Sequence, residues 1–120
     1  MNMLDFVIIG AGPAGEAATH KARALGASVA VVDMGWFGGS GPHIGCVPSK
    51  SLLHAADRHA SGADYPWSRA SARRDYMVNR APDAAEPDDT SHVRALETAG
   101  AATWRGEGRI TAPGVVTVAA

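Results

Sequence analysis

The chain has 120 residues, of which 46% are hydrophobic and 19% are charged, an ordinary composition for a globular protein of one domain. Its net charge of −1 gives no reason to expect a nucleic acid or an anionic membrane as a partner. One cysteine excludes an internal disulfide, and the five histidines have no metal-ligand spacing with it. We therefore expect no metal site. No apolar run is long enough to span a membrane and no signal peptide is visible, so we expect a cytoplasmic protein.

The first third of the chain is predicted to form a strand, a turn, a helix and a second strand. Residues 4–9 and 28–32 are short, apolar and β-branched, which is typical of buried parallel strands. Residues 13–25 are rich in alanine and predict a helix that ends near Gly26. This order is that of a dinucleotide-binding α/β unit.

The glycines between the first strand and the helix fit the binding of a phosphate. Gly10 permits a tight turn, Gly12 allows backbone N–H groups to approach a pyrophosphate, and Gly15 allows the helix to pack on the sheet. Pro13 and Ala14 open the helix, whose N-terminus offers unpaired donors to phosphate. The alternative, in which these glycines only form a turn, is disfavoured by the strand before them and the helix after them.

An acidic residue ends the second strand. Asp33 lies 18 residues beyond Gly15, close to the usual position of the acid that binds a ribose hydroxyl. An acid here also argues against a bound 2′-phosphate. The unit alone leaves open whether the nucleotide is NAD or FAD.

Residues 38–50 read GGSGPHIGCVPSK and resemble the redox-active loop of the pyridine nucleotide-disulfide oxidoreductases. That loop runs Gly-Gly-Thr-Cys, four residues, then Cys-x-Pro-Ser-Lys, and its two cysteines form a disulfide beside the flavin. The matching residues, in order, are Gly38, Gly39, Ser40, Gly45, Cys46, Pro48, Ser49 and Lys50. The second cysteine is present as Cys46, whereas Gly41 replaces the first.

The resemblance implies an α/β fold, a partial Rossmann-like FAD-binding domain whose parallel sheet is flanked by helices. The cofactor-binding residues that it implies are Gly10, Gly12, Pro13, Ala14, Gly15, Asp33, Gly39, Ser40, Gly41, Lys50 and Gly108. Lys50 would lie close to the flavin, where a cation stabilises negative charge on the reduced ring. Cys46 is the catalytic candidate.

The loss of one sulfur changes what this loop can do. In the family, the cysteine at the place of Gly41 attacks the substrate disulfide, and the one matched by Cys46 contacts the flavin. One thiol cannot close an internal disulfide, so dithiol–disulfide cycling is excluded. Two alternatives stay open for Cys46: an activated thiolate that cycles through sulfenic acid or a mixed disulfide, or an inert buried cysteine.

Weaker signals continue along the chain. Residues 65–75 resemble the family's next helix, residues 81–89 predict an exposed loop, and Asp89 or Thr90 would cap a helix through Leu96. Residues 102–105 predict a strand. Residues 106–110 resemble a family turn in which Gly108 lies where the backbone contacts adenine, and residues 115–118 predict the first strand of a β excursion.

The remaining aromatic and basic residues are expected to have structural roles. His43 is expected to make a surface polar contact, His54 and His59 to lie on a helix surface, and the three tryptophans to pack. The arginines at positions 69, 73 and 74 are expected on a solvated helix face.

The resemblance covers this chain and only the first part of a family member. Residues 1–120 would form the N-terminal part of an FAD/NAD(P)-binding domain, without the nicotinamide and dimerisation domains. NAD(P)H would therefore act only through domains absent here. Parts of the sheet would also be missing, so apolar edges would be uncovered and the chain would be poorly stable. The partners expected besides FAD are the remainder of the enzyme or a homodimer partner.

The function implied is electron transfer from NAD(P)H through FAD to a disulfide-type acceptor, with no turnover expected from this short chain. Two alternatives stay open. One is a non-catalytic nucleotide-binding remnant or partner-dependent fragment, and the other is a plain NAD-binding protein.

Overall fold

The structure, a computed structural model, describes residues 3–81 and 87–120. These residues divide into two compact units, one of Met1–Gly39 with Asp89–Ala120 and one of Ser40–Asp88. The elements in chain order are β1 (Phe6–Ile9), α1 (Pro13–Ala24), β2 (Val29–Asp33), α2 (Ser40–Ile44), α3 (Cys46–Ala60), α4 (Trp67–Asn79), α5 (Thr90–Thr98), β3 (Ala102–Arg105), β4 (Glu107–Ala112) and β5 (Val115–Ala119).

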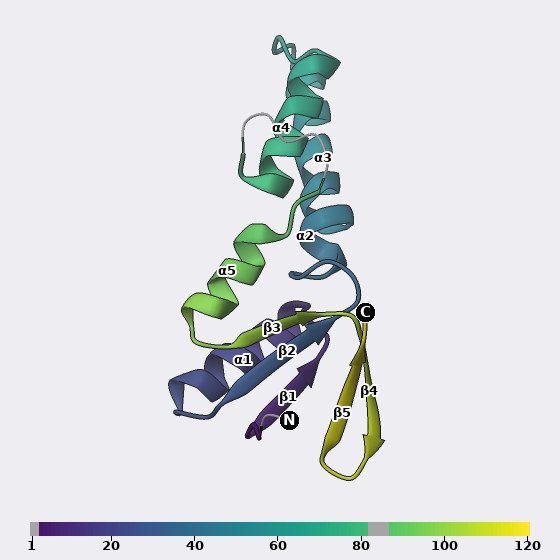
Figure 1. The fold of residues 1–120 in the computed structure, drawn as a ribbon. Coiled ribbons are helices and arrows are strands. Elements are labelled where there is room, and N and C mark those ends of the chain that lie inside the picture. Colours follow the sequence, from purple (N-terminus) through teal and green to yellow (C-terminus); the bar gives the residue numbers. More distant parts are fainter. Residues whose placement is uncertain (1–2, 82–86) are drawn as a thin grey trace. The chain divides into compact units, whose positions relative to one another are not determined.

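The first unit is built on a parallel sheet with the order β1-β2-β3 (Figure 1). Val31 of β2 pairs with Ile8 on one side and with Thr103 on the other. Residues 29–32 of β2 are at most 2% exposed, because this central strand is covered on both faces. The predicted α/β fold with a parallel sheet is confirmed.

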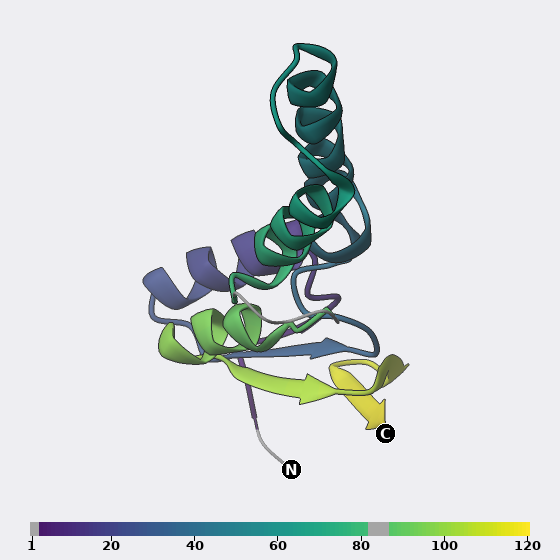
Figure 2. The ribbon, with the colours of Figure 1, turned by 90° about the horizontal axis from the view of Figure 1, so that it is seen from above.

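One face of the sheet is covered by α1 and α5, which lie side by side in Figure 2. Val29 and Val31 pack there against Phe37 and Leu96, both of which are almost completely buried. Arg23 of α1 also donates a hydrogen bond of 3.0 Å to the carbonyl of Ala99, the residue after α5. The predicted helices at both places are confirmed.

The other face of the sheet carries a β-hairpin of β4 and β5. A Cβ added to Gly108 would lie 3.1 Å from Val32 Cγ1 and 3.3 Å from Ile9 Cγ1, so the backbone of β4 lies directly on the sheet. The turn predicted at residues 106–110 is wrong, because all but Gly106 belong to β4, whose backbone groups pair with β5. Residues 115–118 accordingly lie in the second strand of the hairpin rather than in a first one.

The second unit consists of α2, α3 and α4. Ala55 of α3 and Ala70 of α4 form its small core with Tyr65, and Arg69 lies over the Tyr65 ring at 4.2 Å from the centroid. The helix expected near residues 65–75 is confirmed as α4. Of the loop predicted at 81–89, residues 82–86 lie outside the described residues.

Several large apolar side chains are exposed. Phe6 and Ile9 of β1 are 54% and 47% exposed, as expected for an uncovered apolar edge, since β1 has a neighbour on one side only within the described sheet. The three tryptophans are 37–67% exposed, so none of them belongs to the buried core. Across the described residues, no helix combines the length and apolar character that crossing a membrane requires.

The core position of Leu96 gives a test of the first unit. Leu96→Ala should lower the free energy of unfolding by about 2–5 kcal/mol, because it removes a fully buried side chain and leaves a cavity. Leu25→Ala, at a residue that is 74% exposed, is the matched control and should change it by less than about 0.5 kcal/mol. Equal effects of the two changes in urea unfolding would contradict this core.

Candidate nucleotide-binding and thiol sites

The turn between β1 and α1 requires glycine at two positions. Gly10 has a φ of +106° and donates a hydrogen bond of 2.8 Å to the carbonyl of Val32. A Cβ added to Gly15 would lie 1.8 Å from the carbonyl oxygen of Gly10, so no side chain fits there. The glycines therefore bring the first turn of α1 directly against the end of β1.

The N-terminus of α1 opens onto a concave surface. Gly12 is the N-cap and Pro13 the first helical residue, and the first helical N–H bond runs from Glu16 to the Gly12 carbonyl. The N–H groups of Ala14 and Gly15 precede it and therefore have no acceptor within the helix. A cavity of about 450 Å³ lies here, lined by Ile8, Ile9, Gly10, Gly12, Pro13, Ala14, Gly15 and Ala18.

A second glycine turn lies beside the first. Gly39 has a φ of +80°, and a Cβ added to it would lie 3.0 Å from Gly12 Cα and 3.3 Å from Pro13 Cδ. Gly38 donates a hydrogen bond of 2.7 Å to the carbonyl of Ala11. The turns that follow β1 and β2 thus meet backbone to backbone.

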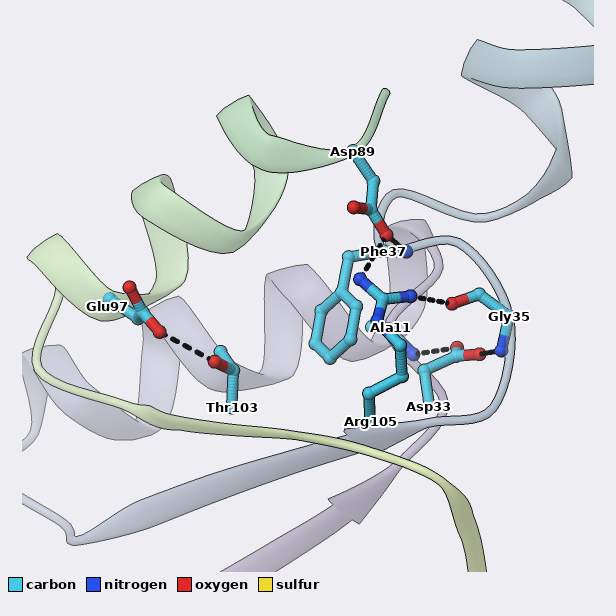
Figure 3. Close-up of polar contacts among 8 residues, drawn as sticks. All are labelled: Ala11, Asp33, Gly35, Phe37, Asp89, Glu97, Thr103 and Arg105. Atoms are coloured by element: carbon cyan, nitrogen blue, oxygen red, sulfur yellow. Dashed lines mark hydrogen bonds and ion pairs between the residues drawn. The ribbon is translucent and has the colours of Figure 1, made fainter. Parts of the chain in front are cut away.

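The side chain of Asp33 joins these two turns. Its Oδ2 accepts a hydrogen bond of 2.7 Å from the N–H of Ala11, and its Oδ1 accepts one of 2.7 Å from the N–H of Gly35 (Figure 3). Sequence analysis assigned only a ribose contact to this residue and missed its contacts to the backbone. Each carboxylate oxygen can accept a further bond, so a ribose hydroxyl remains a possible donor.

An ion pair that sequence analysis missed holds the same loop from the end of β3. Arg105 donates to the carbonyl of Gly35 and lies 2.7 Å from Asp89 Oδ2, which also accepts a hydrogen bond of 2.8 Å from the N–H of Phe37 (Figure 3). The Arg105 guanidinium is 5.0 Å from the centroid of the buried Phe37 ring. Sequence spacing carries no signal for these contacts.

The second unit contains the thiol. Cys46 is exposed and begins α3, so the expectation of a buried cysteine is wrong, while the reactivity of its thiol stays a prediction. Its Sγ lies 3.8 Å from the carbonyl oxygen of Gly41, and a Cβ added to Gly41 would lie 3.5 Å from that Sγ. Ser40 begins α2 and is exposed. Lys50 lies one turn beyond Cys46 on α3 and is also exposed.

The histidine of this loop lies elsewhere than expected. His43 is only 3% exposed, so the predicted surface contact is wrong. The short helix α2 packs against α3 and α4, and His43 lines a cavity of about 140 Å³ with residues that include Arg74, Asp75 and Asn79. Among the described residues, no group of three or more His, Cys, Asp or Glu is placed to hold a metal ion.

A dinucleotide-type glycine turn on a parallel sheet defines the class of this fold. The sequence profile of the pyridine nucleotide-disulphide oxidoreductases matches residues 4–116. The chain therefore belongs to the pyridine nucleotide-disulphide oxidoreductase family.

The similar proteins are much longer than this chain. Dihydrolipoyl dehydrogenase of Staphylococcus aureus is 48% identical over 54 residues, 45% of this chain and 12% of the relative. Dihydrolipoyl dehydrogenase 3 of Pseudomonas aeruginosa is 39% identical over 74 residues, 61% of this chain and 16% of the relative. The chain thus spans less than a fifth of these curated relatives.

Solved structures of a flavoprotein resemble the whole fold. The Cu(II) complex of the HOCl-induced flavoprotein disulfide reductase RclA from Escherichia coli has a TM-score of 0.75 at 24% identity, covering 100% of this chain and 25% of that one. A cysteine-to-serine mutant of RclA in the same kind of complex has a TM-score of 0.73 at 26% identity, covering 92% of this chain and 23% of that one.

The contact between Gly41 and Cys46 predicts a disulfide. Gly41→Cys should oxidise to a bond with Cys46, because the added Cβ fits in ordinary contact with Sγ and Gly41 has no left-handed φ. Closing so short a loop should add about 2 kcal/mol to the stability of the oxidised protein. Non-reducing mass spectrometry should show the loss of two hydrogens, and Gly41→Ser should not. Two free thiols after oxidation would contradict the geometry.

The role of Asp33 in joining the two turns can be tested without any ligand. Asp33→Asn replaces one accepting oxygen with an NH₂ group that faces a backbone N–H, so stability should fall by about 1.5–3 kcal/mol. Asp57→Asn, on the exposed surface of α3, is the control and should unfold at the same urea concentration as the unmodified chain. An unchanged midpoint for Asp33→Asn would show that the two bonds do not hold the turns.

Proposed function

We propose that this chain is the FAD-binding segment of a flavin-dependent oxidoreductase that passes electrons from NAD(P)H through FAD to a disulfide-type or related acceptor. The strongest support is the close approach of Gly12 and Gly39. A Cβ added to Gly39 would lie 3.0 Å from the Cα of Gly12. Neither glycine carries a side chain at this point, which lies beside a helix N-terminus, and this arrangement suits a pyrophosphate.

The residues present fit the nucleotide part of FAD. The pyrophosphate would be held by Gly10, Gly12, Pro13, Ala14, Gly15 and Gly39. Ser40 and Gly41, in the second unit, are proposed as further FAD contacts on the family resemblance alone. Asp33 would accept a ribose hydroxyl through its remaining lone pairs. For Gly108, packing against Val32 and Ile9 already accounts for the glycine, and a backbone contact to adenine is a further proposed role.

The second unit has one thiol where the family motif has two, so it can carry out fewer redox reactions. Bound FAD would supply two-electron transfer, with Lys50 proposed to stabilise negative charge on the reduced ring. Cys46 is the proposed redox thiol, and its exposure gives a soluble disulfide access to Sγ. No second thiol is present to resolve a mixed disulfide, so we expect no disulfide turnover from this chain alone. NAD(P)H would bind to domains beyond this segment.

A second candidate is a non-catalytic nucleotide-binding remnant, or a fragment that acts with a partner. Gly41 favours it, because the position of the attacking thiol carries no side chain at all. The partner would be the remainder of the enzyme or a second copy of a longer chain. Loss of the attacking thiol leaves the proposed nucleotide cradle unchanged, so both candidates share FAD binding and differ only in turnover.

Titration of the purified chain with FAD tests the proposal. Saturable binding, seen as a change in flavin fluorescence and a raised Tm, is expected. Gly12→Val should weaken it at least about tenfold, because a side chain would displace the phosphate from the backbone donors. A Cβ at Gly12 has its nearest neighbour at 3.9 Å, so without FAD the variant should lose only about 1 kcal/mol of stability, the cost of valine at an N-cap.

Ala17→Val, at an exposed position of the same helix, is the control and should bind FAD as the unmodified chain does. Preferential binding of NAD would instead support a plain NAD-binding protein. Unchanged FAD affinity in Gly12→Val would contradict the cradle.

A further inference from the structure

The second glycine turn is enclosed from two sides. On one side, Gly39 lies against Gly12 and Pro13. On the other, the ring of His92 lies so close to Gly38 that an added Cβ would come within 2.6 Å of its Nδ1 and Cε1 atoms. A wall of the proposed cradle is thus held between α1 and a side chain of α5.

His92 is itself fixed to the first turn of α1. Its Nδ1 lies 2.8 Å from Oε1 of Glu16, and the two side chains are 25% and 26% exposed. Three residues earlier, Asp89 accepts the hydrogen bond from the N–H of Phe37. The start of α5 therefore contacts both the helix that begins at the cradle and the loop that closes it.

The conformation of the enclosed turn is one that needs support. Gly38 and Gly39 have φ values of +98° and +80°, and two adjacent glycines have far more accessible conformations than other residues. The N–H of Gly38 bonds to the carbonyl of Ala11, which joins the pair to the turn before α1, whereas the bond of 3.1 Å from Gly39 to the carbonyl of Trp36 stays within its own loop. Contacts that restrict the pair before a ligand arrives reduce the entropy lost on binding.

We propose that His92 is a positioning residue for nucleotide binding: paired with Glu16, its ring holds the Gly38–Gly39 turn against Gly12. This inference rests on the proposed binding of FAD at this cradle. His92 does not act on the flavin or on an acceptor, and its effect passes through Gly38. We call the residues His92 and Glu16 the α5 clamp.

The test combines a binding measurement with one that needs no ligand. His92→Ala should weaken FAD binding about tenfold, equivalent to about 1.4 kcal/mol. His92→Asn should restore affinity to within about threefold, because its Cγ and side-chain N–H can take the places of two of the three ring atoms nearest Gly38 and donate to Glu16. Glu16→Ala removes the other end of the pair, and a double-mutant cycle with His92→Ala should be clearly non-additive.

Amide hydrogen exchange at Gly38 and Gly39, followed by NMR, reports whether the bonds from these residues to Ala11 and Trp36 stay closed. Exchange should be faster in His92→Ala and slow again in His92→Asn. His59→Ala, an exposed histidine of α3, is the matched control and should change neither the exchange rates nor the FAD affinity. If His92→Ala does not fold, Glu16→Ala and His92→Asn carry the same comparison.

The outcomes separate the two proposals. Unchanged exchange at the two glycines, or faster exchange with unchanged FAD affinity, would overturn the α5 clamp while leaving FAD binding intact. An unmodified chain that does not bind FAD would overturn the proposed function. In that case, faster exchange of the glycine amides in His92→Ala and its reversal in His92→Asn would still support the clamp as a device that positions the turn.

Discussion

The carboxylate of Asp33 joins the two turns on which the candidate nucleotide site depends. Parallel strands bring their carboxyl ends to the same edge of a sheet, so the turns after β1 and β2 start close together. Their N–H groups at Ala11 and Gly35 need acceptors, and Asp33, the last residue of β2, supplies one to each. Two further contacts hold the same turns: Arg105 donates to the carbonyl of Gly35, and Gly39 packs against Gly12.

Absence of side chains is the second constraint on this region. At Gly15 a single methyl group would overlap the carbonyl of Gly10, and at Gly108 it would press on Val32. The first contact brings a helix N-terminus to the sheet, and the second brings the hairpin onto the opposite face. In both cases the glycine is needed because its backbone lies in close contact with another part of the sheet, and not because the chain must be flexible there.

The order of elements was predictable because its signals are local. An apolar run, a glycine turn and an alanine-rich helix are each read within about 15 residues, and they gave β1, α1 and β2. The contacts that shape the candidate site are not local: Phe37 and Asp89 are 52 residues apart, and Glu16 and His92 are 76 apart. No period or spacing connects such pairs. The hairpin was missed because a family likeness suggested a turn where the residues themselves permit a strand.

The loop that carries Gly41 and Cys46 has room for the second thiol of the family motif but does not have that thiol. Gly41 stands where the resemblance places a cysteine, yet its Cβ position lies 3.5 Å from Cys46 Sγ, in ordinary contact. The backbone thus keeps room for a side chain that the sequence no longer has. The α2 helix, which packs on α3 and α4 and buries His43, holds this backbone without any contribution from a disulfide. The loss at position 41 is therefore chemical, and the structure around it is retained by packing.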